Sequence, residues 1–437
     1  MRCAGRDIHL SYSANVHPAE TVDELLNVLR RHVAPVMRAA FGPGEAAVNL
    51  RFGMAQVDEL LGHPSLPTTS TLSDAVLSAP PVPRCQELIG ALSELKLRVV
   101  SVNGFPIRDF HAPRVKEQVY SPPWTDGGRV VYSLKIAKVL AQLIGGRAGA
   151  PVSVPSGTFK GYTDNDEIKA QCAHFLTECA RELARLERLI GKTIPLGLEP
   201  EPHTTGETTD EFIEYYQRFI VPAAREKLPL QLGITGNHAE DLARRFLTVN
   251  LDLCHQAVEF EDPVESLKKL RAAGLAVTGL HLSAALKLPE PARNAAAFEQ
   301  LMALDEPRYL HQVVARKQDG SLERFEDLPD LRNPRRMRGL KVADFAEVRC
   351  HFHVPLFADF PGPLASTRDV VGPAACFAAR ENLTGNFVVE TYTWGVLNDL
   401  AKAGVAGAQA IVSPQGVDVN AGLARELQWA LTASAMR

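Results

Sequence analysis

The chain has 437 residues, of which 46% are hydrophobic, so it can bury a large core. Its formal net charge of −4 gives no basic field for nucleic acid or for an anionic membrane. No stretch approaches the roughly 18 uninterrupted apolar residues of a transmembrane helix. Because the N-terminus also lacks the apolar core of a signal peptide, we expect a cytoplasmic protein with no membrane insertion and no nucleic-acid partner.

The seven cysteines are spread along the chain without any Cys-x-x-Cys pair. A disulfide framework or a zinc ribbon would need regularly spaced, paired cysteines, so neither is predicted. Cys172 and Cys179 share the apolar stripe of a predicted helix, and free cysteine is among the most buried residue types. We therefore interpret the cysteines as reduced thiols, mostly in the core.

Strands and helices alternate from the start of the chain. Residues 8–18 predict a first strand with polar groups at its end. Residues 21–34 predict a helix, because apolar residues recur at helical spacing behind Thr21 and Glu24, which form a capping-box pattern. Further strands are predicted at 46–52, 97–106 and 152–157, and further helices at 84–96, 126–144 and 164–190. The last of these helices has Asp164 as its expected cap and Gly191 as its stop.

The same alternation continues to residue 283. Apolar strands are predicted at 196–202, 247–255 and 277–283, and helices at 209–227, from Asn237 onward and at 262–274. Alternation of this length is typical of a parallel α/β fold with right-handed crossovers. We predict a (β/α)8 TIM barrel, formed by residues 1–437 as a single domain.

The alternation breaks over residues 284–350, which we predict to be an insertion between the last two barrel strands. Two short strand patterns, 309–314 and 322–325, flank Asp319 and Gly320 and predict a β-hairpin that caps the barrel. The remaining segments are predicted as a solvated basic loop at 332–341, an extra strand at 350–357, a helix at 366–382, a strand at 387–393 and a closing helix at 420–434.

Four of the predicted strands end in a carboxylate or an imidazole. Each of these groups follows an apolar run, and they are Glu199, Asp252, His281 and Glu390. A parallel barrel gathers residues from its strand ends into one site at its C-terminal face. Any one of the four alone is more simply a solvated loop residue or a helix cap. Four together, each behind an apolar run, predict a functional site.

Three carboxylates and one imidazole form an oxygen-rich set of side chains. Such a set suits one divalent metal ion, with Mn²⁺ or Mg²⁺ favoured and Zn²⁺ or Co²⁺ compatible with the histidine. The ion could bind two adjacent oxygens of a hydroxy-ketone and stabilise the enediolate formed on proton removal. Glu199 and Glu390 could serve as acid and base on opposite faces of the carbon, and His255 could contact a substrate oxygen.

Two residues are alternatives to members of this set. Glu201 shares strand parity with Glu199 and could be the ligand in its place, because the flanking prolines leave the register open. His353, in the string His351-Phe-His353, could compete with His281 as the nitrogen ligand, or both histidines of the string could be structural.

Further residues are candidate substrate contacts because of their place in the chain. Asn15 and Asn103 stand at predicted strand ends, and His255, Glu201 and His353 would lie near the same rim. The loop up to about residue 124 is long and aromatic, which is typical of a functional lid. We expect a small-molecule substrate, and the sequence is compatible with a homo-oligomer.

Several strings resemble those of a known superfamily, the xylose-isomerase-like TIM barrels of sugar isomerases and epimerases. They are Leu198-Glu-Pro200, Asp252-Leu-Cys-His255, His281 behind an apolar strand, and Val389-Glu-Thr391. Longer strings are similar to the branch of EboE-type metabolite traffic proteins. These are Asn103-Gly-Phe-Pro106, Leu198-Glu-Pro-Glu-Pro202, Cys254-His-Gln-Ala-Val-Glu-Phe-Glu-Asp262, His351-Phe-His-Val-Pro355 and Glu390-Thr-Tyr-Thr-Trp394.

The resemblance carries its own expectations. The superfamily implies a single divalent metal held by Glu199, Asp252, His281 and Glu390, with His255 as a substrate contact. The branch implies a role, within a gene cluster, in making or moving a secondary metabolite. The insertion and the His-Phe-His string depart from the ordinary sugar-epimerase pattern, so the nitrogen ligand and the substrate size stay open at this point.

Our first functional hypothesis is a metal-dependent isomerase or epimerase acting on a polyol, cyclitol or keto-sugar-like metabolite. The alternatives are a non-catalytic metabolite-binding or traffic protein that uses the same pocket, and a metal-dependent dehydratase or hydrolase of the same fold. An endonuclease-type phosphodiesterase is disfavoured, because it would need a basic groove and the chain is acidic overall.

Overall fold

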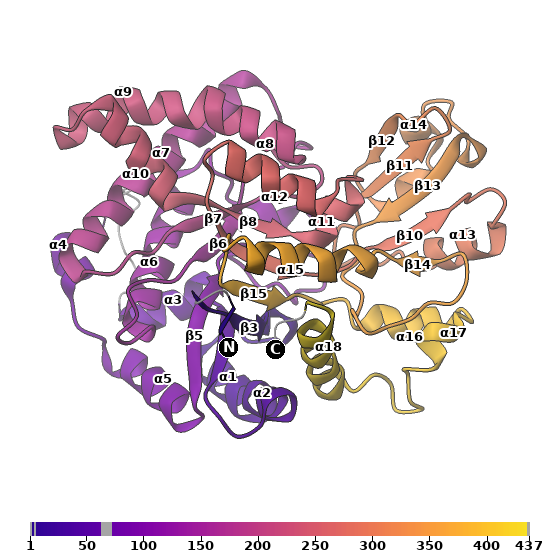
Figure 1. The fold of residues 1–437 in the computed structure, drawn as a ribbon, viewed down its shortest axis with the longest axis horizontal. Helices are drawn as coiled ribbons and strands as arrows, with labels where there is room; N and C mark the ends of the chain where they lie inside the picture. The colour runs from indigo at the N-terminus through magenta and orange to yellow at the C-terminus, as the bar shows by residue number, and fades with distance from the viewer. Residues whose placement is uncertain (1, 4–5, 63–71, 435–437) are drawn as a thin grey trace.

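The computed structural model of the chain describes residues 2–3, 6–62 and 72–434. Its centre is a set of eight parallel strands in the order β3-β15-β9-β8-β7-β6-β5-β4 (Figure 1). A parallel bridge between Ser13 and Asn49 joins the two outer strands, so the sheet closes into the predicted TIM barrel. The barrel strands are β3 (His9–Tyr12), β4 (Ala46–Arg51), β5 (Leu97–Asn103), β6 (Val152–Pro155), β7 (Leu196–Glu199), β8 (Leu247–Asp252), β9 (Val277–Leu282) and β15 (Asn386–Val389).

Helices surround the barrel because its strands are buried on both faces and need apolar cover. They are α1 (Val22–Val28), α2 (Ala34–Phe41), α3 (Met54–Leu61), α4 (Asp74–Ser78), α5 (Pro83–Glu94), α6 (Gly127–Leu143), α7 (Asp166–Ile190), α8 (Thr209–Tyr215), α9 (Val221–Leu232), α10 (Gly236–Phe246), α11 (Leu253–Val258), α12 (Pro263–Ala272), α15 (Val371–Arg380), α16 (Gly395–Lys402), α17 (Ala406–Gln409) and α18 (Val419–Ala433). In the described part of the chain, no helix combines the length and the hydropathy that crossing a bilayer requires.

Helix boundaries follow the local signals in most places. The capping box of Thr21 and Glu24 opens α1 as predicted. Gly191 ends α7 in a left-handed conformation, with φ of 68°, as predicted. The predicted cap of α7 is wrong, because the N-cap is Asn165 rather than Asp164. Oδ1 of Asn165 accepts a hydrogen bond from the backbone N–H of Ile168, in the first turn of the helix, at 2.9 Å. Two adjacent residues of similar capping ability leave this boundary open by one position.

A second, antiparallel sheet lies between β9 and β15 in the chain and stands to one side of the barrel (Figure 1). Its strands, in the order β12-β11-β13-β10-β14, are β10 (Leu286–Pro289), β11 (Val313–Lys317), β12 (Leu322–Phe325), β13 (Phe345–Cys350) and β14 (Ala365–Ser366), accompanied by α13 (Ala295–Met302) and α14 (Pro334–Met337). Strands β11 and β12 pair around a turn that contains Gly320, with φ of 87°. They belong to a five-stranded sheet rather than to an isolated hairpin.

The extra strand predicted at 350–357 is wrong. Strand β13 ends at Cys350, because the N–H of Phe352 turns back onto the carbonyl of Cys350 at 2.8 Å and so leaves the ladder. The N–H of Val354 then bonds to the carbonyl of Ala284, next to the barrel rim, at 3.0 Å. His351 and His353 are therefore carried from the second sheet to the mouth of the barrel on an irregular segment.

The closing helix α18 brings a buried carboxyl group against this segment. Glu426 is fully buried, and its Oε1 accepts hydrogen bonds from the N–H of Leu356 and the hydroxyl of Thr391, both at 2.8 Å. Its Oε2 has no partner among the described residues. Burial raises the pKa of Glu426 to about 8, so the protonated form prevails at neutral pH.

This raised pKa makes stability depend on pH, with a definite sign. A carboxyl group whose pKa is higher in the folded than in the unfolded state stabilises the fold fully below the unfolded value and loses that contribution as pH rises through the folded value. Glu426→Gln keeps the Oε1 acceptor and cannot ionise. Between pH 5 and pH 8, we expect the free energy of unfolding of the wild type to fall relative to that of the variant by about 1.4 kcal/mol per pH unit. The thermal midpoint of the wild type should fall with it. A constant difference across this range would contradict the assignment.

Candidate metal centre

The strand register brings the four predicted strand-end groups to one point on the barrel rim. Asp252 is the direct partner of His281 in the pairing of β8 with β9. The N–H of Glu390 bonds to the carbonyl of Leu282 at 3.1 Å, which sets Glu390 just beyond β9 on its other side. Glu199 ends β7. Ligand atoms of Glu199, Asp252, His281 and Glu390 all lie within 4.8 Å of one another, and all four residues are buried.

The four groups face a common centre next to the ring of His281. Its Nδ1 lies 2.8 Å from Oε2 of Glu390, 3.3 Å from Oε1 of Glu199 and 3.5 Å from Oδ2 of Asp252. Each carboxylate thus presents one oxygen to the same nitrogen. Three oxygens and one nitrogen at these separations can surround a single ion.

The second oxygen of each carboxylate is held by protein donors. Oε1 of Glu390 accepts from Asn103 Nδ2 at 3.2 Å. Oδ1 of Asp252 accepts from the hydroxyl of Ser283 at 2.8 Å, and from the backbone N–H groups of Cys254 at 2.8 Å and His255 at 3.0 Å, because Asp252 is also the N-cap of α11. These bonds orient the carboxylates and leave their other oxygens free to face the centre.

Two atoms of the centre lack any hydrogen-bond partner among the described residues. Oδ2 of Asp252 and Nδ1 of His281 are both buried and form no hydrogen bond, although they lie within ion-pair distance of each other. An unmet buried polar atom costs roughly 1–3 kcal/mol, more when it is charged, so such atoms need a partner that protein atoms do not supply here. A divalent cation meets this need, and an oxygen-rich set with one imidazole is a donor set that such ions take.

Electrostatics also favour positive charge at this point. Burial by itself lowers the pKa of His281, but the carboxylates of Glu390 and Glu199 hold it well above its ordinary value. Burial raises the pKa of Asp252, but neighbouring imidazoles, His255 foremost, hold it well below its usual range. The pKa of Glu390 is lowered by His281 against the effect of burial. The carboxylates of Asp252 and Glu390 are therefore stabilised in ionised form by positive charge next to them.

Asn250 supports the centre and was not predicted. Its Nδ2 lies 3.0 Å from Oε2 of Glu199 and 3.1 Å from Nε2 of His281. Only glycine leaves room for it on the two neighbouring strands, since a Cβ on Gly279 would lie 2.1 Å from its Oδ1 and one on Gly197 would lie 2.9 Å from its Cβ. The signal was present in the sequence, because Gly197, Asn250 and Gly279 each stand two residues before a strand-end group. Ser153, which donates to Oε2 of Glu199, carried no such signal.

The predicted substrate contacts gather beside the centre. A cavity is lined by Asn15, Asn103, Glu199, Glu201, His255, His353 and Glu390 among others. Oδ1 of Asn15 is buried there without a hydrogen-bond partner among the described residues. Burial raises the pKa of Glu201 to about 7, and Asp252 and Glu201 raise the pKa of His255 against the effect of burial. The amides, carboxylates and imidazoles of this lining can form hydrogen bonds with a small polar molecule.

The two candidate nitrogen ligands occupy different places. His281 belongs to the group with three carboxylates, whereas Nδ1 of His353 lies 2.8 Å from the backbone carbonyl of Glu390. Its other ring nitrogen, Nε2, lies 2.9 Å from Nε2 of His351. Glu201 likewise does not belong to the four-residue group. Its Oε1 lies 3.7 Å from Nδ1 of His351.

Aromatic side chains cover the cavity from two directions. Phe110 comes from the long loop after β5, Tyr309 from the inserted segment and Tyr392 from the loop after β15. Their ring centroids are 4.8 Å apart for Phe110 and Tyr309, and 5.4 Å apart for each of the other two pairs. The three rings thus contact one another and form an apolar part of the cavity lining.

The loop after β5 and the inserted segment are fastened to one another. The N–H groups of Val115 and Lys116 bond to the carbonyl of Arg308 at 2.8 and 2.7 Å. The ammonium of Lys116 lies 2.5 Å from Oδ2 of Asp327. The insertion therefore helps to enclose the cavity. The barrel alone would leave the centre more open.

No protein-family model matches the chain, and no curated protein matches it significantly. Among solved structures, the chain is similar to the IolI protein with a bound zinc atom, at 12% identity over 93% of this chain and 100% of the other, with a TM-score of 0.38. It is also similar to L-ribulose 3-epimerase, at 13% identity over 69% and 80%, with a TM-score of 0.34.

A third similar structure is a fusion of a xylose isomerase-like TIM barrel with 4-hydroxyphenylpyruvate dioxygenase. It shares 11% identity with this chain over 64% of the chain and 32% of its own length, with a TM-score of 0.32. At such identities the likeness concerns the fold alone, and the narrower resemblance to the metabolite traffic branch stays a prediction. The strand order of the chain itself shows the predicted TIM barrel, and the resemblance of its strings to the xylose isomerase-like superfamily stays a prediction.

Proposed function

We propose that the chain is a divalent-metal-dependent isomerase or epimerase that moves a proton at carbon in a polyol, cyclitol or keto-sugar-like metabolite. The observation that supports this most directly is the convergence of three carboxylate oxygens and one imidazole nitrogen at one point of the barrel rim, where Glu199 and Glu390 also line the adjacent cavity. Mn²⁺ or Mg²⁺ matches the oxygen-rich set best, and Zn²⁺ or Co²⁺ is compatible with the imidazole.

The two glutamates approach the centre from opposite sides. Glu199 ends β7 and Glu390 follows β15, with β8 and β9 between them in the barrel. In the proposed reaction one of the two carboxylates removes the proton from a carbon next to a carbonyl and leaves an enediolate. The other glutamate, in its protonated form, returns a proton to the same or the adjacent carbon. Return to the same carbon gives an epimer, and return to the neighbouring carbon gives an isomer, with no net change in atoms. A bound divalent ion would supply polarisation of the substrate oxygens.

The lining of the cavity favours an unphosphorylated substrate. Among the described residues that line it, Lys116 is the one lysine or arginine, and its ammonium is already paired with Asp327. A phosphate group would find no free cationic side chain of this kind, whereas hydroxyl groups can bond to Asn15, Glu201 and His255. Free keto-sugars and keto-cyclitols therefore fit better than their phosphate esters.

Proton exchange at carbon tests this function directly. The full chain, loaded with Mn²⁺ in deuterated water, is incubated with free ketoses, keto-cyclitols and matched phosphate esters, and deuterium is located by NMR. We expect incorporation at the carbon next to the carbonyl of one or more free compounds, and its loss when a chelator removes the metal.

Other outcomes identify the competing functions. Saturable binding of a compound without any deuterium incorporation would replace the proposal with a metabolite-binding protein. Loss of water from the compound, or cleavage of it, would replace the proposal with a dehydratase or a hydrolase.

A further inference from the structure

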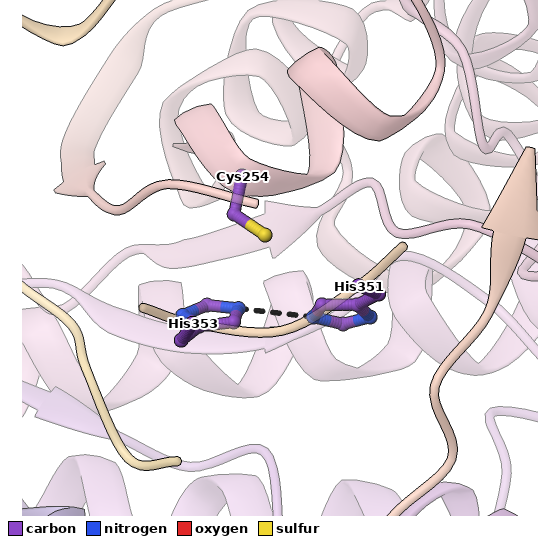
Figure 2. A group of neighbouring side chains, drawn as sticks. All are labelled: Cys254, His351 and His353. Atoms are coloured by element: carbon purple, nitrogen blue, oxygen red, sulfur yellow. Dashed lines mark hydrogen bonds between the residues drawn. The ribbon is translucent and has the colours of Figure 1, made fainter. Parts of the chain in front are cut away.

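A second group of metal-ligating side chains lies next to the four-residue centre and shares no residue with it. It consists of Cys254, His351 and His353, all buried, with one ligand atom of each within 4.8 Å of the others. Figure 2 shows the two imidazoles side by side with the sulfur of Cys254 pointing towards them. Cys254 comes from α11, and the histidines come from the segment that follows β13.

The protonation of His353 is fixed by its surroundings. Its Nδ1 lies 2.8 Å from the backbone carbonyl of Glu390, which can only accept a hydrogen bond. Nδ1 must therefore carry the proton of the neutral ring, and Nε2 keeps a lone pair. Binding of the second ring nitrogen to a backbone carbonyl is the usual arrangement of a metal-ligating histidine.

His351 is fixed in the same way through Gln312. Nδ1 of His351 lies 2.7 Å from Oε1 of Gln312. The amide of Gln312 has a defined orientation, since its Nε2 donates to the carbonyl of Pro202 at 3.3 Å and to the hydroxyl of Tyr120 at 2.9 Å. Oε1 of Gln312 accepts from His351, so Nε2 of His351 also keeps a lone pair.

Two lone pairs are thus held face to face. Nε2 of His351 and Nε2 of His353 are 2.9 Å apart, and neither neutral ring has a proton to place between them. The hydroxyl of Tyr392 lies 3.4 Å from Nε2 of His351 and can donate to that nitrogen, but it does not reach between the two rings' nitrogens as a shared proton would. This arrangement is repulsive unless a proton or a cation lies there. Two nitrogen ligands at about 2.0–2.1 Å from a tetrahedral ion are about 3.3 Å apart, so the two rings would separate by a few tenths of an ångström when an ion binds between them.

The surrounding charge acts on this group in two directions. The carboxylates of Asp252 and Glu390 raise the pKa of His353, while burial and the imidazole of His255 lower it more, so the pKa lies below its ordinary value. The placement of the three ligand atoms, rather than the charge around them, is therefore what favours a metal ion here.

From these observations we infer that Cys254, His351 and His353 form a second metal site, which takes a thiophilic divalent cation of the zinc type. One sulfur and two imidazole nitrogens are ligands that Zn²⁺ and Co²⁺ prefer over Mg²⁺ or Mn²⁺. Three protein ligands leave a position open on a tetrahedral ion, and both histidines line the cavity. The second ion would therefore be accessible to a bound substrate. The inference does not depend on the proposed reaction.

Cobalt binding tests the site with a readout other than activity. The full chain is stripped of metal and titrated with Co²⁺, while the near-ultraviolet absorption that reports cobalt–thiolate bonds is followed. We expect two equivalents per chain, one of which produces this absorption. Cys254→Ser should remove the thiolate absorption and weaken that equivalent by about tenfold or more, and Cys350→Ser, at an equally buried cysteine outside the group, should leave both equivalents unchanged.

Two further variants keep the result interpretable. Glu199→Gln should weaken the Co²⁺ equivalent that shows no thiolate absorption and leave the thiolate-linked equivalent unchanged. Loss of the four-residue centre is thereby distinguished from loss of the second site. His353→Gln should lose the thiolate-linked equivalent if Cys254→Ser does not fold. A single equivalent without thiolate absorption in the wild type would mean that a shared proton, not a metal, lies between the histidines, and would overturn the inference. A second equivalent that survives both variants would overturn it as well.

Discussion

Replacing Glu390 with Gln is expected to lower kcat for proton exchange by roughly 10²–10⁴-fold while the protein stays folded. The amide has nearly the shape of the carboxylate and can still accept from Asn103, which lies 3.2 Å from Oε1. It cannot take a proton from carbon, and it places a neutral group 2.8 Å from Nδ1 of His281, where the wild type has a charged oxygen. Both the base and one ligand of the centre are lost together.

The measurement is the rate of deuterium incorporation at saturating substrate and saturating Mn²⁺. Saturating metal separates loss of the base from weaker metal binding, because the second effect is overcome by concentration. Glu426→Gln is the matched control, since Glu426 is also a fully buried glutamate and bonds to Thr391, the residue after Glu390. Exchange by Glu390→Gln at the rate of this control would rule out Glu390 as an acid or base.

Metal removal is expected to give the second largest effect, on stability. In the four-residue centre, three buried carboxylates repel one another, and a cation that binds the folded state alone stabilises it by mass action. At a concentration one hundred times the Kd, this amounts to about 2.7 kcal/mol. The thermal midpoint of the stripped protein should therefore rise on addition of Mn²⁺, which prefers oxygen ligands and so reports on this centre rather than on the thiolate group.

Asp252→Asn is the variant that isolates the effect. Oδ1 of Asp252 accepts from Ser283, Cys254 and His255, and an asparagine can keep these bonds. The variant loses the unpartnered Oδ2 that faces His281 at 3.5 Å. Its midpoint should no longer respond to Mn²⁺, and without metal it should be less heat-stable than the stripped wild type, because the imidazoles that hold the pKa of Asp252 low favour the ionised carboxylate in the folded state. An equal Mn²⁺ response in both proteins would contradict the assignment of the centre.

The sequence alone determined the barrel and the four strand-end groups. Parallel strands buried on both faces read as apolar runs, and their C-terminal ends meet at one rim, so Glu199, Asp252, His281 and Glu390 could be assigned to one place from their position behind such runs. Asp319 and Gly320 likewise marked the turn between two paired strands of the inserted segment. These are local sequence patterns. They predict the folded structure correctly because the barrel repeats one strand–helix unit.

The tertiary structure decided the surroundings of the centre. Only the register of β8 against β7 and β9 shows that Asn250 fits between two glycines and reaches Glu199 and His281. The strand predicted at 350–357 was wrong because the N–H of Phe352 bonds back to the carbonyl of Cys350. The bond from Val354 to the carbonyl of Ala284, which is distant in sequence, then decides where the segment lies.

The separation of the two histidine environments was likewise decided by contacts distant in sequence. His281 faces carboxylates from three other strands, whereas His351 and His353 are fixed by Gln312 and by the carbonyl of Glu390. Sequence patterns record which side chains share a face of one element, but they carry no information on which acceptor meets a given ring nitrogen. That choice sets the tautomer and the direction of the lone pair, and so decides which histidine can serve which ion.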